Sequence, residues 1–372
     1  MTLNRRKFLG TGAAAAGLVG LNGLPLRAQT KTLNVTAYGG VWEQAIRDCF
    51  VAPFEAKTGA KATVSLGGPA QWLAQVEANP ENPPLDVLIM TPDLAVLAAE
   101  GDLMDEFTVE KLPNLANIPQ AFTDACLGKG TYFDYGVGGI TYNKQAVSEP
   151  PMSFAAFVDR VSSGEFVASV PSIQYGPTTV FFLWALNNAL GGDVNNVDPF
   201  FEAMAKMKDN LVFWAGPNDF FNHLASGEAD LGIYFDGRTW NHVDEGVDWI
   251  DFINPEEGGA MTAVAIQKPK NASDLAWDYL NEVLAPGPQA QFAEILNYGV
   301  TNTEVVYSEK LAARVTPLSK ANLPPYAEIA KVRAYSKLWK QICRDEYGVA
   351  DVRFRAGCQV RSLTLTAQQP EV

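Results

Sequence analysis

The sequence predicts an α/β fold divided into two lobes, and three observations support this. Short apolar strands alternate with helices from residue 33 onward, which favours parallel strands joined by helical crossovers. The 372 residues exceed what one compact core usually holds, so two lobes are expected. A glycine-broken strand at residues 132–142 separates two patterns of elements and marks the expected passage between the lobes.

The first 28 residues predict an export signal that is removed from the mature protein. A basic start at residues 5–7 precedes an apolar run from Ala13 to Leu24, and a small residue suited to cleavage follows at Ala28. Arg5 and Arg6 before Phe8 are typical of the twin-arginine route, so we expect a periplasmic protein. The alternative is a basic, disordered tail.

The charge balance excludes several classes of partner. The chain has 42 acidic and 28 basic residues and a formal net charge of −14, and cleavage after Ala28 would remove four of the basic residues. An acidic surface repels nucleic acid and anionic lipid. No later apolar run reaches the roughly 18 residues of a membrane span, so no insertion of the mature protein is expected.

Four cysteines, Cys49, Cys126, Cys343 and Cys358, lie in a chain expected to reach an oxidising compartment. Four thiols allow three pairings, and the short spacing favours Cys343 with Cys358 without deciding it. No CxxC motif occurs, which disfavours a redox enzyme or a zinc site.

The first strand, residues 33–38, ends at two glycines and leads into an amphipathic helix over residues 41–57. A strand that enters a helix through glycines presents free backbone N–H groups and the positive end of the helix dipole to a ligand. Tyr38, Gly39, Gly40 and Trp42 are therefore a candidate site. The alternative is that Tyr38 and Trp42 are core residues.

The alternation of strands and helices continues along both lobes. Strands at 62–66 and 85–90 complete the first lobe, and Thr91 follows the second of them at the same sheet edge as Gly39. Gly136, Gly138 and Gly139 are interpreted as a flexible point of the connecting strand, and the alternative is a bulged strand within one sheet. The second lobe is expected to contain strands at 167–170 and 212–214 and helices at 178–190, 199–209 and 218–226.

Residues 227–302 are the stretch around which the rest of the chain is organised. A strand at 231–235 ends at Asp236, Gly237 and Arg238, and ligands of open α/β sheets bind at the carboxyl ends of strands. The alternative is that Asp-Gly is ordinary turn chemistry and Arg238 a solvated charge. Two further strands and two helices follow before the sequence NYGVTN.

Catalytic machinery is not evident in the sequence. His223 and His242 are the only histidines, so a three-histidine metal centre cannot be built, and no GxSxG, HExxH or GxxxxGK[ST] motif occurs. We therefore expect a protein that is not an enzyme and holds no metal or other cofactor. An apolar cleft with a few polar groups at a lobe junction is typical of a small-molecule site.

Five segments also carry a resemblance to a known family through their order and spacing. They are TAYGGVWEQAIRDCFVAPFEAKTG, LDVLIMTPD, SGEADLGIYFDGR, INPEEGGAMTAVAIQ and NYGVTN, and they span nearly all of the mature chain. Together they resemble the solute-binding proteins of ABC importers, in particular the branch that includes spermidine/putrescine-binding proteins. The resemblance implies a type II periplasmic-binding-protein fold, in which two lobes with mixed sheets close on a ligand about a hinge of crossing strands.

The resemblance also implies boundaries and ligand contacts. Lobe 1 is expected to comprise residues 31–138 plus 262–302, and lobe 2 residues 139–261 plus 303–372, including C-terminal helices. The contacts carried over by position, besides the four residues at 38–42, are Thr91, Tyr135, Tyr175, Thr178, Phe235, Asp236, Arg238, Thr262 and Tyr298.

The ligand class follows from charges present and absent. Polyamine binders of this family place acidic residues in the loop that here reads SIQYGPTT and a Trp-x-Asp pattern before AMTAVAI, and this chain has a carboxylate at neither place. Arg238 offers a planar fork suited to a carboxylate, and Asp236 could meet an ammonium. We expect an amino-acid-like or opine-like zwitterion or an organic acid, with a polyamine-like solute as the remaining class. The resemblance also disfavours iron, because ferric-binding relatives typically use adjacent tyrosines as metal ligands and no Tyr-Tyr pair occurs here.

The expected function is capture of this solute by a monomer and its delivery to the permease subunits in the inner membrane. One alternative is a periplasmic sensor subunit, which neighbouring genes would distinguish. A less favoured one is a secreted hydrolase that uses Asp236 with His242, and the missing catalytic motifs argue against it.

Overall fold

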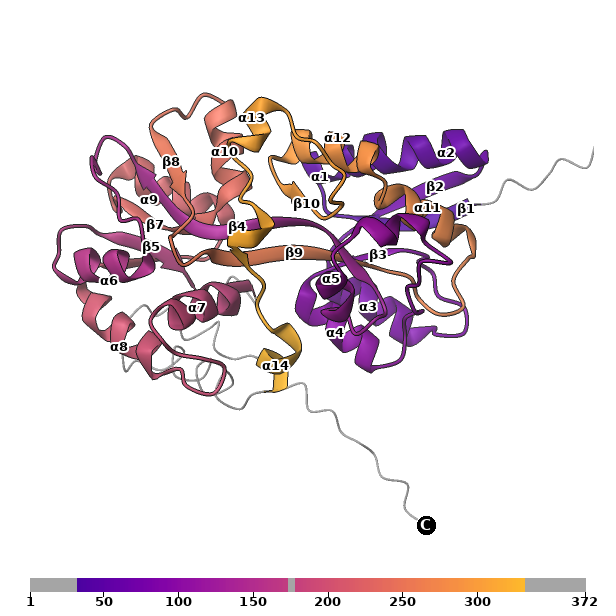
Figure 1. Ribbon diagram of the computed structural model, residues 1–372, viewed down its shortest axis with the longest axis horizontal. Coiled ribbons are helices and arrows are strands. Elements are labelled where there is room, and N and C mark those ends of the chain that lie inside the picture. The colour runs from indigo at the N-terminus through magenta and orange to yellow at the C-terminus, as the bar shows by residue number, and fades with distance from the viewer. Residues whose placement is uncertain (1–31, 173–177, 332–372) are drawn as a thin grey trace, which may run out of the picture.

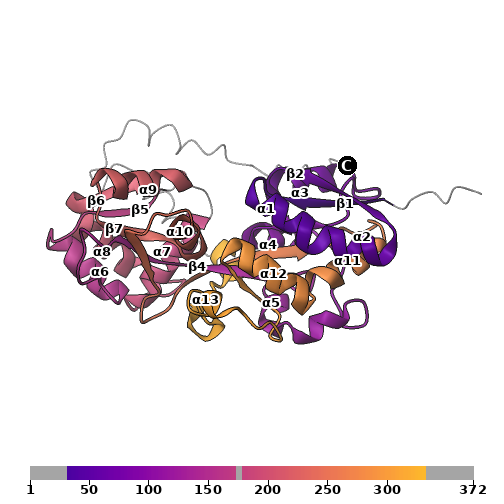
Figure 2. The same cartoon turned by 90° about the horizontal axis from the view of Figure 1, so that it is seen from above.

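The computed structural model describes residues 32–172 and 178–331, which form two lobes joined by two long strands (Figures 1 and 2). The fold is a mixed α/β architecture, as the sequence predicts. The expected signal peptide, Tyr175 and residues 332–372 lie outside the described residues.

The two connecting strands are β4 (Thr131–Asn143) and β9 (Gly259–Gln267), which pair antiparallel from Thr131 opposite Ile266 to Gly138 opposite Ala260. The second half of β4 then pairs with β7 (Leu231–Phe235) on one side and with β8 (Ile250–Ile253) on the other. One strand thus contributes hydrogen bonds to both lobes, and Figure 1 shows β4 and β9 running side by side between them.

Lobe 1 is built around a parallel pair, β1 (Thr32–Ala37) with β2 (Lys61–Leu66), and the short strand β3 (Leu88–Met90), which runs antiparallel to β9. A bridge between Val35 and Val87 links the two parts. The helices of this lobe are α1 (Val41–Ile46), a π-helical turn (Arg47–Val51), α2 (Ala52–Thr58), α3 (Pro69–Ala78), α4 (Pro92–Glu100), α5 (Gln120–Asp124), α11 (Leu275–Val283) and α12 (Pro286–Leu296).

Lobe 2 contains β5 (Ala168–Pro171), which pairs parallel with both β6 (Leu211–Trp214) and β7. Its buried aromatic residues pack closely, and the rings of Phe220 and Tyr234 stack with centroids 4.3 Å apart. The helices of this lobe are α6 (Phe154–Ser162), α7 (Thr178–Ala189), α8 (Asp198–Met207), α9 (Pro217–Ser226) and α10 (Asp236–Asp244). Short 3-10 turns lie at Pro113–Asn117, Lys208–Asn210 and Leu318–Lys320.

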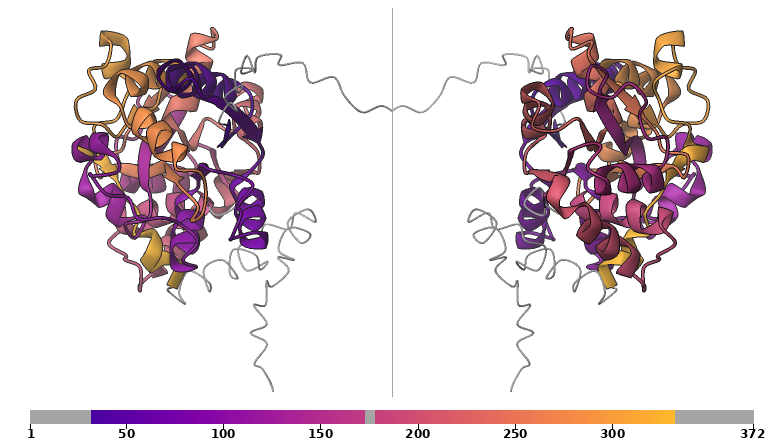
Figure 3. Two further views of the ribbon diagram at one scale, coloured as in Figure 1. Left: turned by 90° about the vertical axis from the view of Figure 1, so that its right-hand side faces the viewer. Right: turned by 90° about the vertical axis from the view of Figure 1, so that its left-hand side faces the viewer.

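The chain after Asn302 contacts both lobes instead of packing on one. It forms α13 (Glu309–Ala312), β11 (Ala321–Asn322), which pairs with the start of β9, and α14 (Tyr326–Lys331) (Figures 1 and 3). Arg314 forms an ion pair with Asp244 at the end of α10. The short strand β10 (Gly299–Val300) pairs with β4 just before this segment.

One local interpretation requires correction. The Asp-Gly turn considered after the strand at 231–235 is the first turn of α10, which begins at Asp236 without an intervening loop. His242 also lies within α10. The change does not move Arg238 away from the carboxyl end of β7.

The glycines of β4 serve close packing. None of Gly136, Gly138 and Gly139 adopts a positive φ, and β4 remains a regular partner of β9 and β7 through them. A Cβ atom on Gly138 would lie 1.8 Å from Cε1 of Phe182. The strand does pass between lobes as expected, and it also has a bulge between Tyr132 and Asp134, but lack of space rather than dihedral freedom explains the glycines.

Cys49 and Cys126 are buried and free. Burial raises the pKa of Cys49 to about 11 and that of Cys126 still further, so neither thiol is activated. Cys343 and Cys358, which the sequence favours as a pair, both lie outside the described residues.

Within residues 32–172 and 178–331, no helix combines the length and apolar character needed to cross a membrane.

We predict that Gly138→Ala lowers the free energy of unfolding by about 1–3 kcal/mol, because the new methyl group must displace the fully buried ring of Phe182. Urea denaturation measures the change. The matched control is Gly287→Ala in α12, where a Cβ displaces no core side chain, so stability should change by less than about 1 kcal/mol even with Pro288 next in the chain. Wild-type stability of the Gly138 variant would contradict the packing argument.

Candidate ligand-binding site

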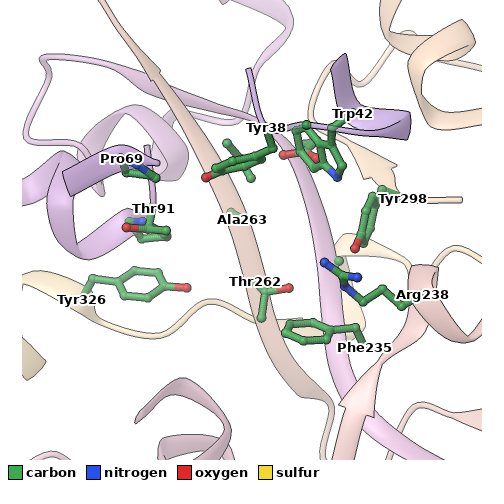
Figure 4. A pocket seen from close by; sticks show the side chains of 15 residues that line it. Tyr38, Trp42, Pro69, Thr91, Phe235, Arg238, Thr262, Ala263, Tyr298 and Tyr326 are labelled. Atoms are coloured by element: carbon green, nitrogen blue, oxygen red, sulfur yellow. The ribbon is translucent and has the colours of Figure 1, made fainter. Parts of the chain in front are cut away.

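A cavity of about 340 Å³ lies where β1, β3, β7 and the two connecting strands meet (Figure 4). Its described lining comes from both lobes, from β4 and β9, and from the segment after Asn302. The lining residues are Tyr38, Gly39, Trp42, Pro69, Thr91, Pro92, Asp134, Gly136, Phe235, Arg238, Thr262, Ala263, Val264, Tyr298 and Tyr326.

The lobe 1 wall is aromatic and firmly anchored. Tyr38 follows β1 and Trp42 lies in the first turn of α1, and their rings meet edge to face with centroids 5.2 Å apart. Trp42 also packs against the buried ring of Phe292 at 5.3 Å and lies 6.2 Å from the ring of Tyr298. Because these rings are fixed by the core behind them, the wall is preorganised for the carbon skeleton of a ligand.

The floor of the cavity is formed by the paired face of β4 and β9. Gly136 lies opposite Thr262 and Asp134 opposite Val264, and all four residues line the cavity. A Cβ on Gly136 would come within 2.7 Å of the Tyr298 ring and 2.9 Å of Oδ1 of Asp236, so this position requires glycine for close packing. Thr91 adds a second hydroxyl from the start of α4, and its side chain does not cap that helix.

The lobe 2 wall supplies the positive charge. Phe235 ends β7, and Arg238 lies in the first turn of α10. Figure 4 shows the Arg238 guanidinium directed into the space between Phe235 and Tyr298, and its carbon lies 6.0 Å from the Phe235 ring centroid. Among the described lining residues Arg238 is the one cation, and its fork of donors suits a carboxylate.

Asp236, which was expected to contact the ligand, instead accepts hydrogen bonds from backbone amides. Its Oδ1 accepts hydrogen bonds from the backbone amides of Val137 at 2.9 Å and Gly237 at 2.7 Å, which joins α10 to β4. Burial raises the pKa of Asp236 to about 7, and these two hydrogen bonds act in the opposite direction. Asp236 is not among the described residues that line the cavity.

The other expected contacts fall into three groups. Tyr38, Gly39, Trp42, Thr91, Phe235, Arg238, Thr262 and Tyr298 are brought together around the cavity. Gly40 and Tyr135 are not among the described lining residues. Gly40 directly precedes α1, with a φ of 71°, and the hydroxyl of Tyr135 donates a hydrogen bond to the carbonyl of Thr316. Tyr175 lies outside the described residues, and Thr178 is described only as the first backbone position of α7.

Asp134 is the functional candidate that the sequence reasoning missed. Its side chain is only 2% exposed, and its Oδ1 has no hydrogen-bond partner. Burial raises the pKa of Asp134 well above its usual range, with a smaller opposing effect from the amide of Val264. The signal was an Asp inside an apolar strand, two residues before Gly136 and therefore on the same face.

The histidines occupy supporting positions. The His242 ring lies 3.8 Å from the Phe221 ring centroid and beside Glu245, and Nδ1 of His223 lies 2.9 Å from Oγ of Ser169. Asp236 is held by backbone amides, so these contacts give no support to an Asp236–His242 hydrolase pair. In the described part of the chain, no group of three or more His, Cys, Asp or Glu side chains is arranged to hold a metal ion.

Solved structures share this fold. An extracellular solute-binding protein from Bordetella parapertussis is 25% identical, with a TM-score of 0.77 over 84% of this chain and 98% of that chain. The Atu4243-GABA receptor is 19% identical, with a TM-score of 0.69 over 84% and 97%. The protein MotA from A. tumefaciens B6, solved with glucopine, is 16% identical, with a TM-score of 0.65 over 84% and 99%. The last two likenesses show the fold alone.

The end of the chain has a second similarity, which the sequence analysis did not anticipate. Residues 301–372 match the methylmalonyl-CoA mutase family. An ethylmalonyl-CoA mutase from Cereibacter sphaeroides is 35% identical over 94 residues, which are 23% of this chain and 14% of that enzyme. The chain therefore spans about a seventh of the length of that mutase.

The longer match covers the lobes and the cavity. Residues 50–317 fit the family of bacterial extracellular solute-binding proteins, whose members bind solutes without converting them. That span contains both connecting strands, Arg238 and Asp134. The resemblance to solute-binding proteins is thus confirmed, while the spermidine/putrescine-like branch stays a prediction. The chain belongs to the bacterial extracellular solute-binding proteins.

Proposed function

We propose that this chain is the periplasmic binding component of an ABC transporter, exported by the twin-arginine route and acting as a monomer. It captures a small zwitterion of the amino-acid or opine type, or an organic acid, and delivers it to permease subunits. The observation that carries the proposal is the Arg238 guanidinium pointing into an aromatic-walled cavity between the lobes of a solute-binding protein.

The size and lining of the cavity support a ligand of this class. A volume of about 340 Å³ lies near the lower end of the range of about 300–1,000 Å³ for small-molecule sites. Tyr38, Trp42 and Tyr298 can pack against a carbon skeleton, and the hydroxyls of Thr91 and Thr262 can accept or donate hydrogen bonds. Arg238 can hold a carboxylate by two parallel hydrogen bonds.

Charge also argues against a polyamine. A ligand with two or more ammonium groups and no anion would meet the positive charge of Arg238 inside the cavity, and like charges disfavour binding. By contrast, GABA and glucopine, named for two proteins of the same fold, each combine a carboxylate with an amine nitrogen. The polyamine class is therefore the least favoured of the three.

Capture is proposed to occur by closure of the lobes about β4 and β9. We keep the boundaries of residues 31–138 plus 262–302 for lobe 1 and 139–261 plus 303–372 for lobe 2. Phe235 and Arg238 would then move with lobe 2 toward Tyr38, Trp42 and Thr91 of lobe 1. Closure would remove water from around Arg238 and strengthen its contact with the ligand.

We predict that Arg238→Ala weakens binding of the anionic or zwitterionic ligand by more than about 1.5 kcal/mol, because a charge-assisted, forked contact is lost. Isothermal titration calorimetry measures the affinity. The matched control is Arg160→Ala in α6, which removes an arginine paired with Glu165 that does not line the cavity. Equal affinity of the Arg238 variant and the wild type would remove Arg238 from the site.

We predict that a ligand of this class raises the melting temperature, since a solute that binds only the folded protein stabilises it by mass action. A thermal-shift screen of amino acids, opines, organic acids and polyamines identifies it. The Arg238→Ala variant should lose the shift produced by the hit. A polyamine as the sole hit would reverse the choice of ligand class, and accumulation of a converted product would refute the binding function.

A further inference from the structure

Two carboxyl side chains in the described part of the chain have a buried oxygen without a hydrogen-bond partner, namely those of Asp93 and Asp134. Only Asp134 lines the cavity, and its residue is 2% exposed. Leaving a buried carboxyl oxygen unpaired costs free energy that folding must offset. The unpaired oxygen of Asp134 is therefore a candidate acceptor for a group of a bound ligand.

The surroundings of Asp134 offer no internal partner for its charge. Among the described residues no Lys, Arg or His forms an ion pair with Asp134. A hydrogen bond from the backbone amide of Val264 lowers the pKa of its carboxyl, but less than burial raises it. Asp236 makes a useful contrast, because its carboxylate accepts from the amides of Val137 and Gly237 and thereby joins two elements. Asp134 has no comparable structural task.

The geometry around Asp134 fits a cationic group. Asp134 lies on the cavity floor, on the same face of β4 as Gly136, and both residues line the cavity. Tyr38, Trp42 and Tyr298 line the same cavity, and aromatic rings attract a cation over their faces. A ligand cation at this point would satisfy the orphan oxygen and favour the ionised carboxylate.

We infer that Asp134 receives a protonated amine of the ligand, so that the bound solute carries a cationic nitrogen for Asp134 and an anionic group for Arg238. This rests on the proposed function and narrows it. Of the three ligand classes, simple organic acids lack the cation and polyamines lack the anion. Amino-acid-like and opine-like zwitterions remain, and Asp134 replaces Asp236 as the counter-ion of their ammonium group.

The first test uses the wild-type protein and matched probes, so it does not depend on a variant that folds. Calorimetry at pH 7 compares 4-aminobutanoate with butanoate, glutamate with 2-hydroxyglutarate, and glucopine with 1,4-diaminobutane. We expect at least one zwitterion to bind, at least about tenfold more tightly than its amine-free partner or the diamine, as loss of a charge-assisted hydrogen bond implies.

The second test uses variants and the tightest zwitterion. Asp134→Asn should weaken its binding at least about tenfold, whereas Asp93→Asn, which removes the other carboxyl with an unpartnered buried oxygen outside the cavity, should change it less than about twofold. Thermal unfolding of each free variant shows that it is folded.

The outcomes separate the inference from the function on which it rests. Equal binding of amine-bearing and amine-free probes, tightest binding of the diamine, or unchanged affinity of Asp134→Asn would overturn the role of Asp134 while leaving a binding protein. No binding of any probe to the wild type would instead overturn the proposed function and the inference together.

Discussion

The antiparallel pairing of β4 with β9 is the constraint on which the structure depends. The ladder runs from Thr131 opposite Ile266 to Gly138 opposite Ala260, and on either side of it the same two strands reach the sheets of lobe 1 and lobe 2. Because the ladder is also the cavity floor, its residues must join the lobes and face the ligand at once. Glycine is required at both Gly136 and Gly138, because the rings of Tyr298 and Phe182 respectively occupy the space that a side chain would need.

The two charged side chains that line the cavity differ in burial: Asp134 is buried in the connecting strands, whereas Arg238 is exposed on lobe 2. Asp134 is buried in the connecting ladder, and its position is fixed by the backbone pairing with Val264. Arg238 is exposed in the first turn of α10, at the rim of lobe 2. In the proposed closing motion, the ammonium of a zwitterion would meet the fixed carboxylate while lobe 2 is open, and Arg238 would complete the site as the lobe closes. Binding energy from the second contact would then favour the closed state, since a ligand shifts an equilibrium only through its differential affinity.

Local sequence pattern was sufficient for the parts of the site that lie at strand ends. Tyr38, Thr91 and Arg238 each follow a short apolar strand, and the carboxyl ends of such strands meet in one place. The sequence could not place Asp236 against β4, because its position beside Arg238 says nothing about the amide of Val137, which comes from a strand about a hundred residues away in the chain. Asp134 was missed because an acidic residue inside an apolar strand usually has a partner within the protein, and only the structure shows that Oδ1 of Asp134 has none. Tyr326 reaches the cavity through long-range packing that has no local signature.

The described segment after Asn302 borders the cavity through Tyr326. Arg314 in this segment forms an ion pair with Asp244 of α10, and its hydrogen bond is the main cause of the lowered pKa of Asp244. The carbonyl of Thr316 accepts a hydrogen bond from the hydroxyl of Tyr135. The match to solute-binding proteins ends at residue 317, whereas Tyr326 lies in the span similar to the mutases. Tyr326 is held by a hydrogen bond to the carbonyl of Met261 and by an edge contact with Tyr132, so it can line the cavity although it lies outside the span that matches the solute-binding family. Among the described lining residues, the charged side chains are those of Arg238 and Asp134, and both lie within residues 50–317, so the proposed charge recognition does not depend on Tyr326.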